Sequence, residues 1–155
     1  MVTIVLVVGH LLVAATWFGA MGYSLGVVQP RARRLFADDP HTYELLATTL
    51  AAGARWKVVA VLGFLGVSGI GLVGATDPAA RGGWWWAVIG VKAVLLVVAS
   101  VLFWYVSWRM WPRRLFALPG ELPLRQREFL RVGAVLLVTA GIASALGGVA
   151  AVLVR

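Results

Sequence analysis

The chain alternates between four long apolar stretches and short polar ones. Between Val2 and Val28 no residue carries a formal charge, and a helix needs only about 20 apolar residues to cross the hydrocarbon core of a bilayer. Similar stretches follow, so the pattern predicts an all-α integral membrane four-helix bundle that forms a single domain over residues 1–155. The expected helices span residues 2–29, 56–75, 84–111 and 127–153, with connections at residues 30–55 and 112–126.

Prolines and an aspartate set the expected helix ends in the two polar connections. Pro30 and Pro112 follow the first and third apolar stretches, and because proline removes a backbone donor inside a helix, we expect both spans to end beside them. In the first connection, the sequence DDP predicts an interfacial helix with Asp39 as its N-cap and Pro40 at its first position.

The composition supports a membrane protein whose main partner is the lipid bilayer. Hydrophobic residues make up 61% of the chain, the mean hydropathy is +0.91, and eight residues are tryptophan. Small residues permit close helix contacts in lipid, so we expect Gly66, and Ser144 within a line from Ala140 to Gly148, to lie at helix interfaces. The chain has no cysteine, which excludes disulfides, thiolate metal sites and a covalent c-type haem.

The net charge of +8 reflects topology. Cytoplasmic loops of membrane proteins are rich in Lys and Arg, so we expect the first and third connections to be cytoplasmic and both termini to lie outside. The basic residues form no aromatic-interleaved patch that would read bases, so we expect no nucleic-acid partner. Eleven of the fourteen basic residues flank these two connections: Arg31, Arg33, Arg34, Arg55, Lys57, Arg109, Arg113, Arg114, Arg125, Arg127 and Arg131.

Two titratable residues interrupt the apolar spans at a similar depth. His10 lies eight residues after Val2, and Lys92 lies eight residues after Trp84, which places each about 12 Å below the outer end at 1.5 Å per residue. Lys92 either snorkels to the headgroups or belongs to a site, whereas His10 is too short to snorkel and we favour a functional role for it. The residues that share its helix face, and that we expect to point inward, are Thr3, Leu6, Ala14, Trp17, Met21 and Ser24.

The sequence RRLFA occurs twice, at residues 33–37 and 113–117. Adding the offset between these two segments carries the first span onto the third and the second onto the fourth. The chain is therefore either two parallel copies of one helical hairpin, with sites expected where the copies meet, or a chance repetition of a short segment. In this register His10 corresponds to Gly90.

The first span, GHLLVAATWFGAMGYSLGVVQP, resembles the N-terminal helix of two groups, the CopD-type copper-resistance membrane domains and the HemJ-type protoporphyrinogen oxidases. His10 before Trp17-Phe18-Gly19 carries the resemblance, and Lys92 in GVKAVLLVV is similar to a lysine in a later helix of both groups. The HemJ resemblance implies haem b or a porphyrin, with His10 as the metal ligand and Lys92 as a partner for propionates or for the redox step. The CopD resemblance implies copper handling in the bacterial inner membrane.

These features support a leading hypothesis and two alternatives. We expect a multi-pass protein of the bacterial inner membrane that binds haem b or a related porphyrin through His10, with Trp17, Met21 and Lys92 in the site. The sequence fits a haem carrier and an oxidase equally well. The second axial position would be open, filled by another residue or supplied by a second subunit. The copper hypothesis is weaker, because Cu(I) sites require several soft donors and the sequence contains no such cluster. The third hypothesis is an accessory subunit that packs within a homo-oligomer or larger complex.

Overall fold

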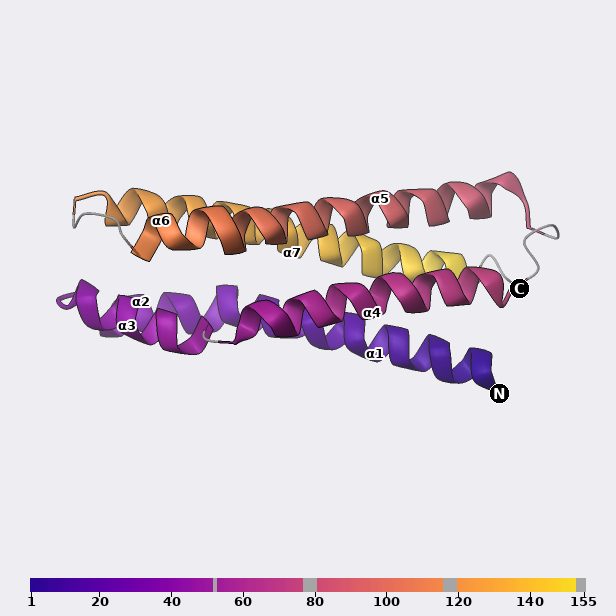
Figure 1. Cartoon of the computed structure of the whole chain (residues 1–155), viewed down its shortest axis with the longest axis horizontal. Coiled ribbons are helices and arrows are strands. Elements are labelled where there is room, and N and C mark those ends of the chain that lie inside the picture. Colours follow the sequence, from indigo (N-terminus) through magenta and orange to yellow (C-terminus); the bar gives the residue numbers. More distant parts are fainter. Residues whose placement is uncertain (52, 77–80, 116–119, 153–155) are drawn as a thin grey trace.

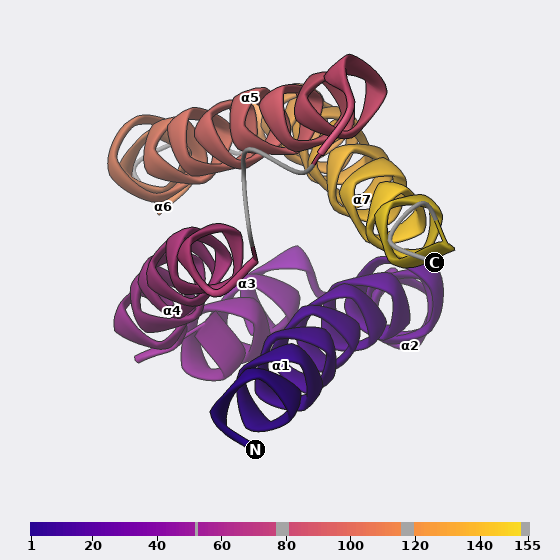
Figure 2. The same cartoon turned by 90° about the vertical axis from the view of Figure 1, so that its right-hand side faces the viewer.

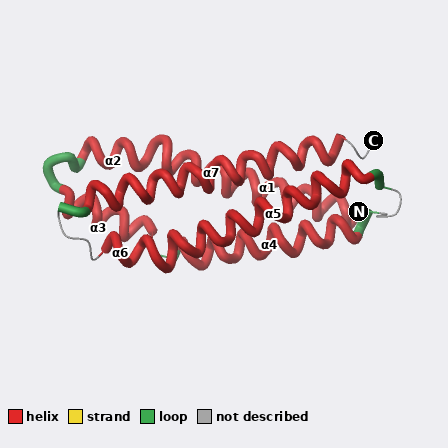
Figure 3. The backbone as a smooth tube through the Cα atoms, turned by 90° about the horizontal axis from the view of Figure 1, so that it is seen from above, coloured by secondary structure: helices red, strands yellow, loops and turns green. Residues whose placement is uncertain are grey.

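The structure is a computed structural model of the chain and describes residues 1–51, 53–76, 81–115 and 120–152. All regular structure in these ranges is helical (Figure 3). Four helical stretches, Val2–Leu35, Ala54–Gly74, Gly83–Arg113 and Leu122–Ala150, are long and apolar enough to cross a membrane, as predicted for a multi-pass membrane protein. The elements are α1 (Val2–Tyr23), η1 (Ser24–Val28), α2 (Gln29–Leu35), α3 (Pro40–Ala51), α4 (Ala54–Gly74), α5 (Gly83–Tyr105), η3 (Val106–Met110), α6 (Trp111–Leu115) and α7 (Leu122–Val152).

The four spans pack as two antiparallel hairpins. α1 lies along α4, and α5 lies along α7 (Figure 1). Seen from one end, the two hairpins form two layers, which meet mainly where α1 packs on α7 (Figure 2). The start of α1 and the described end of α7 lie at one end of the molecule, and α2, α3 and α6 lie at the other (Figure 1).

The first and third spans continue past their prolines, contrary to our expectation that they end at residues 29 and 111. α1 passes through the π-helical turn η1 into α2, and α5 passes through η3 into α6. In these turns the N–H of Gln29 donates to Ser24 and the N–H of Trp111 to Val106, each five residues back. The wider turn directly before each proline relieves the clash that a proline ring makes with the preceding turn.

Arg55 supplies a hydrogen bond that Pro112 cannot make. In the register of η3, the residue that would donate to the Ser107 carbonyl is Pro112, which has no N–H. The Arg55 guanidinium of α4 donates to this carbonyl at 2.7 Å and stacks 4.7 Å from the Trp108 ring centroid. The π-helical turn is thus fixed by a side chain from the other hairpin.

The second and fourth spans begin earlier than predicted. α4 starts at Ala54 instead of residue 56, and α7 at Leu122 instead of residue 127. The basic segment around Arg125 is helical because Pro123 lies in the first turn, where its missing N–H has no helical acceptor to lose. The carbonyl of Glu121 accepts hydrogen bonds from the Leu124 and Arg125 amides, which starts the helix.

The short helix α3 has the predicted N-cap. The Thr42 amide donates to Asp39 Oδ1 at 3.0 Å, and the Thr42 hydroxyl donates to Oδ2. These hydrogen bonds, the hydroxyl above all, favour the ionised carboxylate and hold the pKa of Asp39 below its ordinary value. The expected start of this helix at Pro40 is confirmed.

Glycines mark close approaches between helices, although not along the whole of the predicted stripe. A Cβ atom on Gly66 would lie 3.7 Å from Leu96 Cδ2, so Gly66 is at a helix contact as predicted. Ser144, by contrast, is exposed, and a Cβ on Gly148 would meet nothing within 4 Å. The predicted contact at Ser144 is therefore wrong, because α7 turns a different face toward its neighbours.

That face carries glycines which approach α1 more closely. A Cβ atom on Gly141 would lie 3.1 Å from Phe18 Cε2, and one on Gly133 would lie 3.2 Å from Leu25 Cδ2. Both distances are shorter than ordinary van der Waals contacts, so side chains at these positions would push α1 and α7 apart.

The first and third spans share eight partly or fully buried positions. The two π-helical turns are separated in residue number by as much as Pro30 and Pro112 are. We call this difference in residue number the proline offset. The RRLFA segments lie two positions closer together because PRARR in the first becomes PRR in the second. At the proline offset His10 therefore corresponds to Lys92, whereas the separation of the RRLFA segments pairs it with Gly90. Eight positions of the first span are partly buried: Leu6, His10, Val13, Ala14, Trp17, Met21, Ser24 and Leu25. Their counterparts at the proline offset are also partly or fully buried: Val88, Lys92, Leu95, Leu96, Ala99, Phe103, Val106 and Ser107.

Candidate functional site

His10 points from α1 into the interface with α4. Its Nδ1 lies 2.7 Å from Ser68 Oγ, and its Cε1 lies 3.8 Å from the place where a Cβ on Gly69 would be. The residues predicted to share its inward face are partly buried, except Thr3, which is exposed. The ring is therefore held at the contact between the two helices of the first hairpin.

The hydrogen bonds around Ser68 assign the tautomer of His10. The Ser68 side chain is buried, and its hydroxyl donates to the Phe64 carbonyl at 2.6 Å, as expected for a serine that bonds back to its own helix. Because a hydroxyl has only one hydrogen, Ser68 Oγ must accept the hydrogen bond from His10 Nδ1. In the neutral ring Nε2 then carries a lone pair, and within the described ranges no hydrogen bond uses it.

Lys92 takes the corresponding position on α5 and points toward α7. A Cβ on Gly147 would lie 3.2 Å from Lys92 Nζ. No other Lys, Arg, Asp or Glu occurs between Arg81 and Arg109, and no described residue accepts a hydrogen bond or forms an ion pair with this ammonium. A partly buried cation at this depth of a membrane is costly unless an anion or a polar group joins it.

His10 and Lys92 lie at a similar depth, each eight residues into its predicted span, and no hydrogen bond joins them in the described ranges. Each side chain packs against the second helix of its own hairpin. Trp17 and Met21 share the inward face of His10, but they lie roughly 10 and 16 Å further along α1 at 1.5 Å per residue. The imidazole and the ammonium are therefore the two groups that can act together.

The described surroundings of His10 do not gather several metal donors. No group of three or more His, Cys, Asp or Glu side chains gathers in the part of the chain that the structure describes. His41 in α3 and Met110 in η3 lie toward the opposite end of the molecule (Figure 1), so the soft donors of a Cu(I) site do not meet at His10. An imidazole with one nitrogen held by a hydrogen bond and the other free is the usual arrangement of a metal-ligating histidine.

Comparisons of the chain with protein-family models, with curated proteins and with solved structures found no match. The likeness of the first span to the CopD and HemJ groups thus rests on the residues quoted for it. Function must be inferred from the side chains and their geometry.

Ser68 is the functional residue that sequence reasoning missed as a partner of His10. One signal was present, because Ser68 is the only hydroxyl side chain in the predicted span 56–75, and a buried polar group of one membrane helix tends to bond to a polar group of another. Gly147 carries no such signal, since a glycine beside a lysine is recognisable only once the pairing of α5 with α7 is known.

Proposed function

We propose that the protein binds haem b or a related porphyrin, with His10 Nε2 as the iron ligand and the Lys92 ammonium paired with an acidic group of the same ligand. The observation that carries this proposal is the Lys92 ammonium, which has no described acceptor and lies at the same depth as an imidazole whose Nε2 makes no described hydrogen bond. A ligand that offers both a metal and an anion satisfies both residues. Haem provides its iron for an imidazole and its propionates for a cation.

The free-energy cost of placing Lys92 inside the membrane favours a bound ligand over a site without one. A lysine near the centre of a membrane span costs about 2.5–3.5 kcal/mol on insertion scales, and a hydrogen-bonded carboxylate removes much of that cost. Orientation of the imidazole by Ser68 adds to metal affinity, since partners of this kind typically contribute about 10- to 100-fold. The chain supplies a single intramembrane histidine, so the second axial position falls to another residue or to a neighbouring subunit.

We infer that the site lies in the outer half of a bacterial inner membrane. The two basic connections leave the same end of the helix pairs, around α2, α3 and α6 (Figure 1). By the positive-inside rule this end is cytoplasmic. The start of α1 and the end of α7 are then outside, together with the ends of the helices that hold His10 and Lys92.

We further infer that the two hairpins are parallel copies related by an axis along the membrane normal. Support comes from two contacts between the layers, Leu25 with Gly133 and Ser107 with Arg55. Ser107 follows Leu25 by the proline offset. Gly133 follows Arg55 by a difference in residue number that is four smaller than the proline offset, and we call this difference the α4–α7 offset. With these two offsets, each contact is the counterpart of the other.

The same two offsets relate the candidate site residues to each other. Lys92 follows His10 by the proline offset, and Gly147 follows Gly69 by the α4–α7 offset. His10 packs near Gly69 just as Lys92 packs near Gly147. The imidazole and the ammonium then occupy equivalent positions in the two copies, and a single ligand between the copies meets both.

Titration of the purified protein with hemin tests the proposal. After unbound hemin has been removed by gel filtration, the wild-type protein should carry a Soret band and His10→Ala should not, whereas Lys92→Met should keep a protein-bound band and bind hemin at least tenfold more weakly. Lys57→Met is a control that removes the same charge from an exposed position at the far end of α4. A wild-type protein that is colourless after expression with ample haem and gains no band would rule out haem; metal analysis would then separate copper handling from an accessory subunit.

A further inference from the structure

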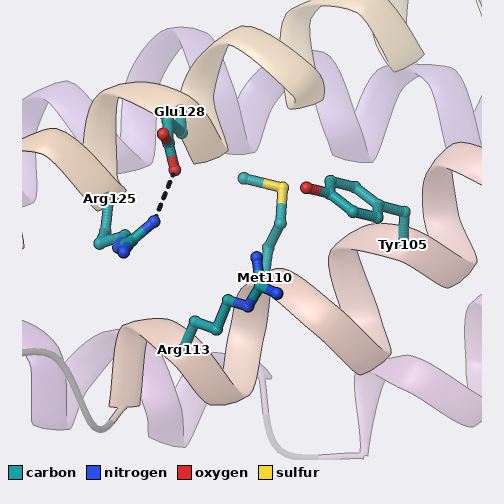
Figure 4. Close-up of a pocket in the computed structure, with 5 residues that line it drawn as sticks. All are labelled: Tyr105, Met110, Arg113, Arg125 and Glu128. Carbon is teal, nitrogen blue, oxygen red and sulfur yellow. Dashed lines mark hydrogen bonds and ion pairs between the residues drawn. The ribbon is translucent and has the colours of Figure 1, made fainter.

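A second polar site lies near the opposite end of the molecule, between η3, α6 and the first turns of α7. It is an open recess of about 320 Å³, lined by Tyr105, Met110, Arg113, Arg125, Glu128 and Arg131. In Figure 4 the Tyr105 hydroxyl faces the Met110 sulfur, while Arg125 and Glu128 approach from α7 and Arg113 from α6. The haem proposal does not involve any of these residues.

The charge of this recess is strongly positive. Three arginines face one carboxylate, that of Glu128, which lies 3.4 Å from Arg125. Arg113 and Arg131 have no ion pair with any described residue. Guanidinium groups bind phosphate oxygens in a bidentate manner, so the recess has the chemistry of a phosphate site.

The recess is built by a part of α7 that has no counterpart in the first hairpin. With the α4–α7 offset, Ala54 at the start of α4 corresponds to Val132, whereas α7 already begins at Leu122. Its extra turns contain Arg125, Glu128 and Arg131. In the first hairpin the chain forms the separate helix α3 instead, so the recess is an addition specific to the second hairpin.

The surface next to the recess is suited to acyl chains. Toward the middle of the spans, α5 exposes Val98, Val101 and Trp104, and α7 exposes Val135 and Val138. A phosphate in the recess would therefore sit at the level of the basic connections with apolar side chains directly beyond it. Basic pockets between membrane helices on the cytoplasmic side are known to hold anionic lipid headgroups.

From this arrangement, we propose that the recess binds the phosphate headgroup of an anionic phospholipid, with Arg113 and Arg131 as the principal phosphate ligands and the acyl chains along α5 and α7. Arg125 stays paired with Glu128 at the rim and tunes the charge of the site. The bound lipid would brace α6 against the first turns of α7.

Native mass spectrometry of the protein released from mixed micelles tests this proposal. With equal amounts of phosphatidylglycerol and phosphatidylcholine, the wild-type protein should retain one phosphatidylglycerol molecule in preference. The double variant Arg113→Gln/Arg131→Gln should lose this preference at least tenfold. The control Arg109→Gln/Arg127→Gln removes the same charge from exposed arginines at the same end, outside the recess, and should retain it.

Three results would overturn the proposal. The first is no preference in the wild-type protein, a measurement that needs no variant to fold. The second is an equal loss in both double variants, which indicates a diffuse surface charge. The third is displacement of the lipid by millimolar inorganic phosphate, which indicates a soluble phosphate ligand.

Discussion

His10 Nδ1 lies 2.7 Å from the hydroxyl of Ser68, which in turn donates to the Phe64 carbonyl of its own helix. This chain of two hydrogen bonds crosses from α1 to α4 and fixes both the orientation and the tautomer of the imidazole. It leaves Nε2 without a described hydrogen bond, so a ligand can use this nitrogen.

The Ser68→Ala variant should bind hemin about 10- to 100-fold more weakly than the wild-type protein, because the imidazole loses the partner that holds it. Ser100→Ala is the matched control, since the Ser100 hydroxyl also donates to its own helix, at Leu96, but has no hydrogen-bonding partner on another described helix. Titration followed by absorption measures both affinities. Equal affinities in the two variants would show that Ser68 does not position the ligand.

The spans and the inward face of the first helix were predictable from the sequence because both follow from periodicity. An uncharged run of sufficient length requires a helix in lipid, and about 100° per residue places Leu6, His10 and Ala14 on one side. The continuation past Pro30 was not predictable in the same way, since an α-helical register predicts a break there and only the π-helical turn before it removes the clash.

Membrane topology can be tested with single cysteines, because the chain contains none. A cysteine at Gly82 should react with an impermeant maleimide in intact cells, whereas one at Ala37 should react only after lysis, since positive connections stay in the cytoplasm. Both positions are exposed. The reverse pattern of labelling would invert the orientation and place His10 in the inner half of the membrane.

Close packing between α1 and α7 predicts a selective effect at Gly141. Gly141→Leu should destabilise the protein by about 1–3 kcal/mol. A Cβ atom at this position would already lie 3.1 Å from Phe18 Cε2, and the larger leucine side chain would overpack the contact. Gly63 occupies the corresponding position of α4, where a Cβ would meet nothing within 4 Å, so Gly63→Leu should be tolerated. Thermal unfolding in detergent compares the two, and similar melting temperatures would argue against the contact.

The N-cap of α3 predicts a pH dependence with a defined sign. The pKa of Asp39 lies below its ordinary value of 3.8, chiefly through the Thr42 hydroxyl, so the cap contributes fully above that value and is lost as the pH falls through the lowered pKa. Amide exchange protection in α3, corrected for intrinsic rates, should therefore drop in acid. Asp39→Asn keeps an acceptor but cannot titrate, and the same drop in that variant would exclude Asp39 as the cause.

The candidate site could be predicted only in part. His10 and Lys92 stand out because each is a polar group in an apolar span, and the cost of burying them is a property of the residue itself. The equivalence that we propose for them depends on the proline offset, which the shorter PRR segment hides from a direct comparison of the two RRLFA segments. The roles of Ser68 and Gly147 depend on which helices pair, and that information lies in tertiary packing.

The most direct test of the haem proposal is chemical rescue of a His10→Gly variant. If Nε2 of His10 is the iron ligand, this variant should carry no Soret absorbance once unbound hemin has been removed by gel filtration, and imidazole added with the hemin should restore a protein-bound Soret band with the position and intensity of the wild-type protein. Circular dichroism should confirm that the helices are intact. Wild-type hemin binding by His10→Gly in the absence of imidazole would contradict the proposed role of His10.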